Sequence, residues 1–279
     1  MVAVGGDNSW SLVEASAIAG LVTRSLLHPI DTCKVINQVS TASTSPRGLF
    51  STTRDIVKHQ GMRGLYRGFP VALVGTVPGV TLYFTSFNLI KGYIDKRVPS
   101  YPNVSNFAAG FLAEVVSCVI WVPTDVVKER AQASQSTINM WKVLSSDGWK
   151  GLYRGYGATL ASFGPFSAFY FMFAEQLKDH YSKTFMRPTL SFYELMPLCA
   201  IAGGAAAFCS APMDLVKVRM QVERRSASTY QGFIPSLTKI WRTEGLRGLF
   251  RGGGSRVWFA VPNTAITMSL LESIKSRLD

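Results

Sequence analysis

The chain has 279 residues, of which 47% are hydrophobic and only 16% are charged, and its formal net charge is +12. This composition is too polar for membrane spans alone and too apolar for an average soluble domain, but apolar spans that alternate with basic loops would produce it. The sequence has no Lys/Arg-rich run and no helix motif that reads nucleic acid, so the positive charge favours contact with anionic lipid over nucleic acid.

The first ten residues, Met1 to Trp10, carry neither a basic amphipathic pattern nor a signal-peptide pattern, so we expect any targeting signal within the chain. Four cysteines without Cys-x-x-Cys spacing are interpreted as small hydrophobic packing residues. They are Cys33, Cys118, Cys199 and Cys209. We find no nucleophile–base pattern, phosphate-binding loop or metal-ligand spacing, and we therefore predict no enzyme, no cofactor and no metal site.

Six apolar segments follow one another, and each is long enough to cross a hydrocarbon core of ~30 Å as a helix. They cover residues 11–37, 70–92, 105–131, 157–180, 194–221 and 254–276. Each odd-numbered segment contains a proline, which removes a backbone hydrogen bond and predicts a bend. Small residues recur near the segment starts, as at Ser16 and Gly20, and would permit close helix contact.

The longer connections, after the odd segments, share a short amphipathic pattern followed by a glycine-rich stretch. The glycine-rich stretches are 60–68, 147–155 and 244–252. An amphipathic pattern of this kind predicts a helix at the membrane surface. Its apolar positions in the last connection are Ile234, Leu237, Ile240 and Trp241. The long connections hold fourteen Lys and Arg residues and the short ones four, which predicts that the long connections face the inside and both termini the opposite side.

One motif, Pro-x-Asp-x-x-Lys-x-x-x-Gln, occurs three times, near the end of each odd segment. It begins at Pro29, Pro123 and Pro212, at intervals of 94 and 89 residues. A proline, a carboxylate and a cation are costly inside an apolar segment, so three copies at a nearly constant period indicate internal triplication. We divide the chain into three repeats within one compact membrane domain. The repeats cover 1–98, 99–188 and 189–279.

These motifs, with the glycine-rich stretch after each, resemble the mitochondrial carrier family over nearly the whole chain. The resemblance implies an all-α membrane protein, a three-fold pseudosymmetric six-transmembrane-helix bundle with three short matrix-side amphipathic helices. It also implies a monomer in the mitochondrial inner membrane with both termini toward the intermembrane space. Such a protein transports a small molecule through one central site that opens to each side in turn.

By the same resemblance, the motif residues form a matrix gate of ion pairs between repeats. The implied pairs are Asp31–Lys128, Asp125–Lys217 and Asp214–Lys34, braced by Gln38, Gln132 and Gln221. Such a ring closes one end without permanent bonds, so it can open when substrate binding compensates. The alternative is a static buried network that only holds the fold.

A second gate is implied toward the intermembrane space. Its implied contacts are the ion pairs Glu175–Lys275 and Glu272–Lys91 and a hydrogen bond between Asn88 and Lys178. Because the first repeat has Asn88 where the family pattern has an acid, we expect a weaker barrier on this side.

Substrate-contact positions in this family lie just before the prolines of the even segments. The resemblance places them at Gly75, at the pair Ser162 and Phe163, and at Phe259. None is charged, which argues against nucleotide and di- or tricarboxylate substrates, whose anionic groups need Arg or Lys. Charges at membrane depth usually face water or substrate. We therefore add Arg24, Glu114 and the nearby Tyr83 and Tyr170, although the aromatic residues could equally be packing, and Arg256 could face lipid or the gate.

The second repeat is similar to mitochondrial S-adenosylmethionine carriers over 114–132, 151–156 and 165–167. The sulfonium cation of that substrate suits Glu114 and an aromatic-lined cavity. The chain departs from those carriers at Ser162 and Phe163, where they have an Arg–Glu pair, and at Trp121, where they have Arg. We expect S-adenosylmethionine exchange. The alternatives are another small neutral or cationic metabolite, iron (residues 262–267 resemble mitochondrial iron carriers), or a carrier-fold protein that does not transport.

The helix starts that follow the glycine-rich stretches predict a lipid site. Free backbone N–H groups, a positive helix-dipole end and an adjacent arginine could hold the phosphates of cardiolipin, which the family is known to bind. The residues concerned are Arg67, Gly68, Arg154, Gly155, Arg251 and Gly252. The alternative is a simple surface turn.

Overall fold

The computed structural model describes residues 9–40, 48–97, 102–134, 138–186, 191–224 and 229–278, and these contain helices and no strand. The long helices are α1 (Ser9–Val39), α3 (Phe69–Arg97), α4 (Pro102–Ala133), α6 (Tyr156–Phe185), α7 (Phe192–Cys209) and α10 (Gly253–Leu278). The shorter ones are α2 (Leu49–Gln60), the 3-10 helix η2 (Met62–Tyr66), α5 (Met140–Leu152), α8 (Ala211–Val222) and α9 (Phe233–Leu249). The all-helical prediction is confirmed for the described part of the chain.

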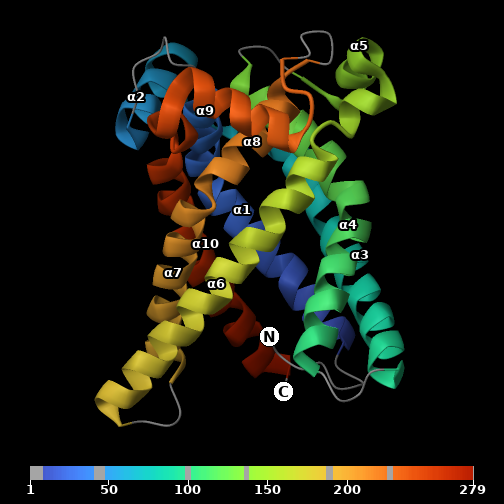
Figure 1. Cartoon of the computed structure of the whole chain (residues 1–279), viewed down its shortest axis with the longest axis vertical. Helices are drawn as coiled ribbons and strands as arrows, with labels where there is room; N and C mark the ends of the chain where they lie inside the picture. Colours follow the sequence, from blue (N-terminus) through green and yellow to red (C-terminus); the bar gives the residue numbers. More distant parts are fainter. Residues whose placement is uncertain are drawn as a thin grey trace.

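The long helices form a ring in which each packs on its neighbours in the order α1, α3, α4, α6, α7, α10 and back to α1. Figure 1 shows α2, α5, α8 and α9 gathered at one end, while α1 begins and α10 ends at the other. The long helices lie closer together at the end that carries the short helices. We call this the network end, because the ion pairs described below lie there.

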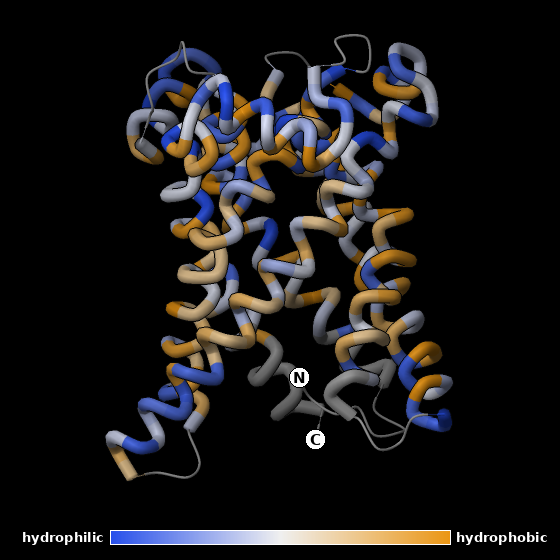
Figure 2. The backbone as a smooth tube through the Cα atoms, in the orientation of Figure 1, coloured by the Kyte–Doolittle hydropathy of each residue, from blue (hydrophilic) through white to orange (hydrophobic). Residues whose placement is uncertain are grey.

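Hydropathy along the helices agrees with a membrane setting. Hydrophobic residues dominate the middle of the long helices, and hydrophilic ones concentrate toward both ends (Figure 2). By length and composition, three helical stretches of the described residues could cross a membrane: Met62–Arg97, Ser105–Ala133 and Phe192–Cys209. All six predicted apolar segments lie within helical regions. Only three of the described helical stretches meet this criterion, however, so the six-span arrangement remains a prediction.

The motif prolines affect the backbone differently in the three repeats. Helices α1 and α4 continue through Pro29 and Pro123. The third odd segment is not one helix as predicted, because it breaks at Ser210, between α7 and α8 and just before Pro212. The Ser210 carbonyl is not left unpaired, since the Arg256 guanidinium donates to it at 2.6 Å.

Small residues allow the long helices to approach closely. A Cβ atom at Gly203 would lie 2.7 Å from the hydroxyl of Thr264, and one at Gly204 would lie 2.8 Å from Val261, so α7 packs directly against α10. On the other side of the ring, a Cβ at Gly79 of α3 would lie 2.7 Å from the Trp121 ring of α4. Close approach through small residues is typical of helices that associate in membranes.

The amphipathic helix that the sequence predicts in the last long connection is present as α9. In α9, Ile240 is buried and Leu237 packs on the same apolar cluster. Ile234 and Trp241 are exposed. One face of α9 therefore covers α8 and the neighbouring core, while the other carries exposed apolar side chains, as expected of a helix that lies on a membrane surface.

Candidate functional site

Three ion pairs join the repeats at the network end. Lys128 Nζ lies 3.1 Å from Asp31, Lys217 Nζ lies 2.9 Å from Asp125, and Lys34 Nζ lies 2.9 Å from Asp214. The motif segments of α1, α4 and α8 thus form a closed triangle, and the six side chains are nearly buried. Each expected pair is present in the structure, and their role as a gate remains a prediction.

The ring is not fully three-fold. Gln38 donates to Asp214 at 2.9 Å, and Gln132 donates to Asp31 at 3.2 Å, as expected of bracing residues. Gln221 departs from this pattern because it donates to Thr159 at 3.3 Å and not to Asp125. Arg256 adds a fourth cation, with Nε 3.4 Å from Asp214, so it faces the ring rather than lipid.

A fourth carboxylate, Glu129, lies beside the ring and was not predicted as a site residue. It is 3% exposed, and its Oε2 atom is buried without a hydrogen-bond partner among the described residues. It follows Lys128 directly, at the place where the other two repeats have the buried valines Val35 and Val218. A comparison of the three repeats position by position would have found it.

Two arginines tie neighbouring repeats together behind the ring. Arg130 pairs with Asp147 and donates to the Gln221 carbonyl at 2.9 Å. Arg219 pairs with Glu244 and donates to the Gln38 carbonyl at 3.0 Å. Each guanidinium therefore connects the acid of its own repeat to the end of the motif in the next repeat. We call these contacts the arginine clasps.

The first repeat lacks an arginine clasp. It has Ile36 where the others have Arg130 and Arg219, and Gln60 where they have the acid. Cation and acid are therefore lost together, which agrees with their acting as a pair. The α1–α4 edge of the triangle is consequently held by fewer charged contacts than the other two edges.

The arginines of the predicted lipid sites contact backbone of the next repeat. Arg67 donates to the Ser134 carbonyl at 2.6 Å, Arg154 to the Arg224 carbonyl at 3.0 Å, and Arg251 to the Ser40 carbonyl at 3.1 Å. Their guanidinium groups thus reinforce the seams between repeats. Phosphate binding by the backbone N–H groups at the starts of α3, α6 and α10 remains a prediction.

The four predicted substrate-contact positions lie in different settings. Gly75 is buried, and a Cβ atom there would lie 2.5 Å from Thr124, so α4 fills this position. Ser162 is buried, whereas Phe163 and Phe259 are half-buried. The Phe259 ring lies 5.7 Å from Lys34 Nζ, which places it next to the ring of ion pairs.

The other predicted substrate residues also differ in their surroundings. Tyr170 stacks on Phe166 within α6, and Tyr83 stacks on Phe87 within α3. Arg24 lies over the Trp121 ring at 4.6 Å, and Glu114 contacts only the side chains of Ser117 and Cys118, on the next turn of its own helix. Arg24 and Glu114 are half-buried charges without an ion pair among the described residues.

Comparisons with known proteins identify the family. The profile of the family described as "Mitochondrial carrier protein" matches residues 6–98, 99–185 and 188–279. The chain belongs to the mitochondrial carrier family. It is therefore a transporter of the mitochondrial inner membrane and not an enzyme.

Named relatives cover nearly the whole carrier. The "Mitochondrial S-adenosylmethionine carrier protein" of Danio rerio is 33% identical over 95% of this chain and 96% of its own length. Its namesake in Mus musculus is 35% identical over 85% of this chain and 84% of its own length. The "Mitochondrial substrate carrier family protein E" of Dictyostelium discoideum is 30% identical over 96% of both chains.

The predicted second gate of this carrier lies partly outside the described residues, and its ion pairs remain a prediction. Lys91 pairs with Asp95 of its own helix at 3.0 Å. Glu175 is exposed, and Lys178 and Asn88 are half-buried without a contact between them. The side chains of Glu272 and Lys275 lie outside the described residues.

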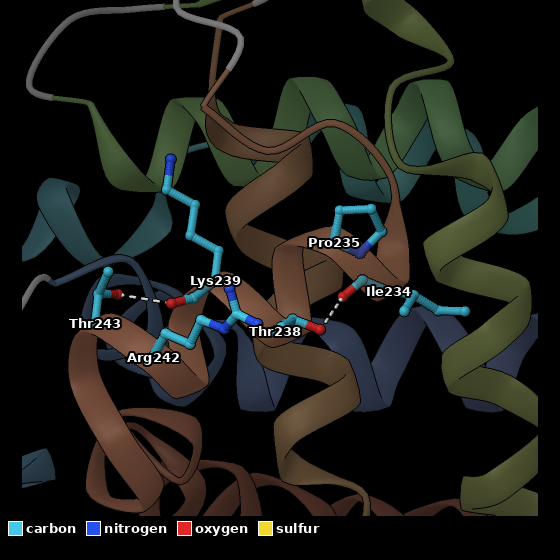
Figure 3. A pocket seen from close by; sticks show the side chains of 6 residues that line it. All are labelled: Ile234, Pro235, Thr238, Lys239, Arg242 and Thr243. Carbon is cyan, nitrogen blue, oxygen red and sulfur yellow. Dashed lines mark hydrogen bonds between the residues drawn. The ribbon is translucent and has the colours of Figure 1, made fainter.

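A surface groove of about 400 Å³ runs along the outer side of α9 in this carrier (Figure 3). It is lined by Ile234, Pro235, Thr238, Lys239, Arg242 and Thr243. All six residues belong to one helix, and the hydrogen bonds of Thr238 and Thr243 stay within it. The groove is therefore a feature of the amphipathic face and separate from the predicted transport site.

Proposed function

We propose that this carrier exchanges S-adenosylmethionine across the mitochondrial inner membrane by alternating access. Six helical units, with α7 and α8 counted as one, would cross the membrane. The network end would face the matrix, and the start of α1 and the end of α10 would face the intermembrane space. The excess of Lys and Arg in the long connections supports this orientation.

The ring of three inter-repeat ion pairs is the observation that carries the proposal. All six partners lie at one end of the bundle, and each pair joins two different repeats. At the other end, Lys91 pairs within its own helix. A ring of contacts between repeats that closes one end of the bundle is what alternating access requires of one of its two states.

The choice of substrate rests on charge and on the relatives. The positions Gly75, Ser162 and Phe259 carry no charge, which suits neither nucleotides nor tricarboxylates. Glu114 offers a negative charge to a cation, and nearby aromatic rings could add a cation–π contribution. Two relatives at 33% and 35% identity carry the name of S-adenosylmethionine carriers, and this supports the same substrate here.

We further propose that the protein works as a monomer and binds cardiolipin at the network end. Every contact of the ion-pair ring closes within one chain, so a second copy is not needed to complete it. The starts of α3, α6 and α10 would bind the phosphates through backbone N–H groups.

Exchange by purified protein in liposomes tests the function. Liposomes loaded with S-adenosylmethionine should take up labelled S-adenosylmethionine in a saturable manner, and liposomes without internal substrate should take up much less. Uptake no greater than that of protein-free liposomes would overturn the proposed substrate. If the protein exchanges another small cationic metabolite and not S-adenosylmethionine, the proposed transport function stands and that metabolite becomes the substrate.

A further inference from the structure

Arg24 is an interior arginine that forms no ion pair within the described part of the chain. The guanidinium groups of Arg130, Arg219 and Arg256 each have a carboxylate partner. The Arg24 side chain has neither an ion pair nor a hydrogen bond to another described residue, and it is half-buried. Its guanidinium lies over the Trp121 ring, 4.6 Å from the centroid. A cation held by a ring and not by a carboxylate keeps its N–H donors free for a ligand.

The Trp121 ring is itself fixed by the neighbouring helix. Three atoms of the ring would lie 2.7–3.1 Å from a Cβ atom at Gly79, so the ring packs on the bare backbone of α3. A larger residue at 79 would push the ring away. The contacts therefore run from Gly79 to Trp121 to Arg24, and they link three helices.

Glu114 is the opposite unpaired charge. It lies on α4, seven residues before Trp121, which places it roughly 10 Å farther from the network end along the helix. Its side chain contacts Ser117 and Cys118 of its own helix and has no ion pair with another described residue. A half-buried carboxylate that has no ion pair among the described residues suits a cationic group of a ligand.

We propose that Arg24, presented by Trp121, binds the carboxylate of the transported molecule, and that Glu114 binds its cationic group. The substrate class is thus a zwitterion that carries a carboxylate and, farther along the molecule, a cation. The inference rests on the proposed transport function and deepens it. Arg24 and Trp121 then determine specificity, and Gly79 is a positioning residue.

A competing explanation assigns Arg24 to the ion-pair ring, because the Trp121 ring that it lies over is one helical turn before Asp125. That role would change stability and the rate of exchange equally for all substrates. A substrate carboxylate bound by Arg24 would change the preference between substrates. Preference is therefore the quantity to measure.

The experiment compares matched substrates in liposomes. Exchange is measured for S-adenosylmethionine and its decarboxylated form, and for lysine and its decarboxylated form cadaverine. The proteins are wild type, Arg24→Ala, Trp121→Leu, Trp121→Phe, Gly79→Ala and Glu114→Gln. The control is Gly92→Ala on the same helix as Gly79, since a Cβ at Gly92 meets nothing within 4 Å.

Wild type should prefer the carboxylated member of a pair by about tenfold or more, as expected of charge-assisted hydrogen bonds. Arg24→Ala should abolish that preference, Trp121→Leu and Gly79→Ala should reduce it, and Trp121→Phe should retain part of it. Glu114→Gln should weaken exchange of both members, and Gly92→Ala should match wild type. Melting temperatures identify any variant that fails to fold.

An unchanged preference in a folded Arg24→Ala variant would overturn the inference, as would wild-type exchange of cadaverine at the rate of lysine. If S-adenosylmethionine is not exchanged but lysine is, with the same dependence on Arg24, the proposed substrate fails and the inference holds. If folded wild type exchanges none of the four compounds, both fail.

Discussion

Three glycines bring the ends of the long connections against the ion-pair ring. Gly68, Gly155 and Gly252 have φ of +73°, +82° and +74°, where residues with a Cβ atom are strained. Each also lies close to the motif of the next repeat. A Cβ atom at Gly68 would lie 2.9 Å from the Lys128 carbonyl oxygen. A Cβ at Gly155 would lie 2.8 Å from the Gln221 side chain, and one at Gly252 would lie 2.7 Å from the Gln38 side chain. Glycine is therefore required at all three positions for two independent reasons, the left-handed backbone and the close approach to the next repeat.

Gly252→Ala should therefore destabilise the protein. The left-handed backbone alone costs about 1–2 kcal/mol for a residue with a Cβ atom, and the contact with Gln38 adds to it. Gly254→Ala is the matched control, because a Cβ at 254 meets nothing within 4 Å. Thermal unfolding in detergent should show a clear loss for the first variant and none for the second. Equal melting temperatures would contradict this account of the glycine.

The motif residues were largely predictable from sequence, and their additional neighbours were not. The spacing repeated three times, so the resemblance could assign Asp31, Asp125 and Asp214 to partners in other repeats. Arg256 and Glu129 occur once and break the three-fold pattern, so periodicity alone could not place them. Gln221 occupies the motif position of the bracing glutamines yet donates to Thr159. The partner of a side chain depends on which groups lie nearby in the fold, and motif spacing does not specify those groups.

At the scale of the element, the arginine clasps connect helices of different repeats. Arg219 of α8 is 3% exposed and contacts Glu244 of α9 together with the carbonyls of Gln38 and Ser40. Its removal would leave a nearly buried carboxylate and two carbonyls without this donor. The Arg219 side chain therefore holds three elements together: the C-terminal end of α1, helix α8 and helix α9.

Arg219→Ala should cost about 3–5 kcal/mol, the usual penalty for removing one partner of a buried ion pair. Arg242→Ala on α9 is the control, because Arg242 is an exposed arginine on the outer groove (Figure 3). We expect a large fall in melting temperature for Arg219→Ala and little change for Arg242→Ala. A similar small change in both would show that the clasp does not hold the helices together.

The elements themselves followed from hydropathy and periodicity, with one exception. The break at Ser210 was not predicted, because the Ser210 carbonyl is satisfied by Arg256, 46 residues farther along the chain. A contact over that distance leaves no local signal. The substrate positions were less predictable still, since the packing of Gly75 against Thr124 depends on the neighbouring helix α4.

At the scale of the whole molecule, the two ends of the bundle differ in their contacts. The network end is closed by cross-repeat ion pairs, whereas at the opposite end Lys91 pairs with Asp95 of its own helix. If the protein alternates between two states, a stronger contact at the opposite end should favour the state that closes there.

Asn88→Asp tests this, because it supplies the acid that the first repeat lacks opposite Lys178. A partly exposed ion pair contributes up to about 1 kcal/mol, which corresponds to roughly 2–4 °C in melting temperature for a chain of this size. We expect a rise in melting temperature in detergent. The gain should disappear in Asn88→Asp/Lys178→Ala, and an unchanged melting temperature in the single variant would contradict the expectation.

The most direct test of the gate is to reverse the charges of one pair. Asp125 and Lys217 join α4 to α8 at 2.9 Å. We would measure exchange in liposomes for Asp125→Lys, Lys217→Asp and the double variant, with melting temperatures for each. Because the ring must close in register, each single variant should lose most of its exchange and the double variant should regain a substantial part of it. Exchange at the wild-type rate in the single variants, or a folded double variant no better than the singles, would contradict the account.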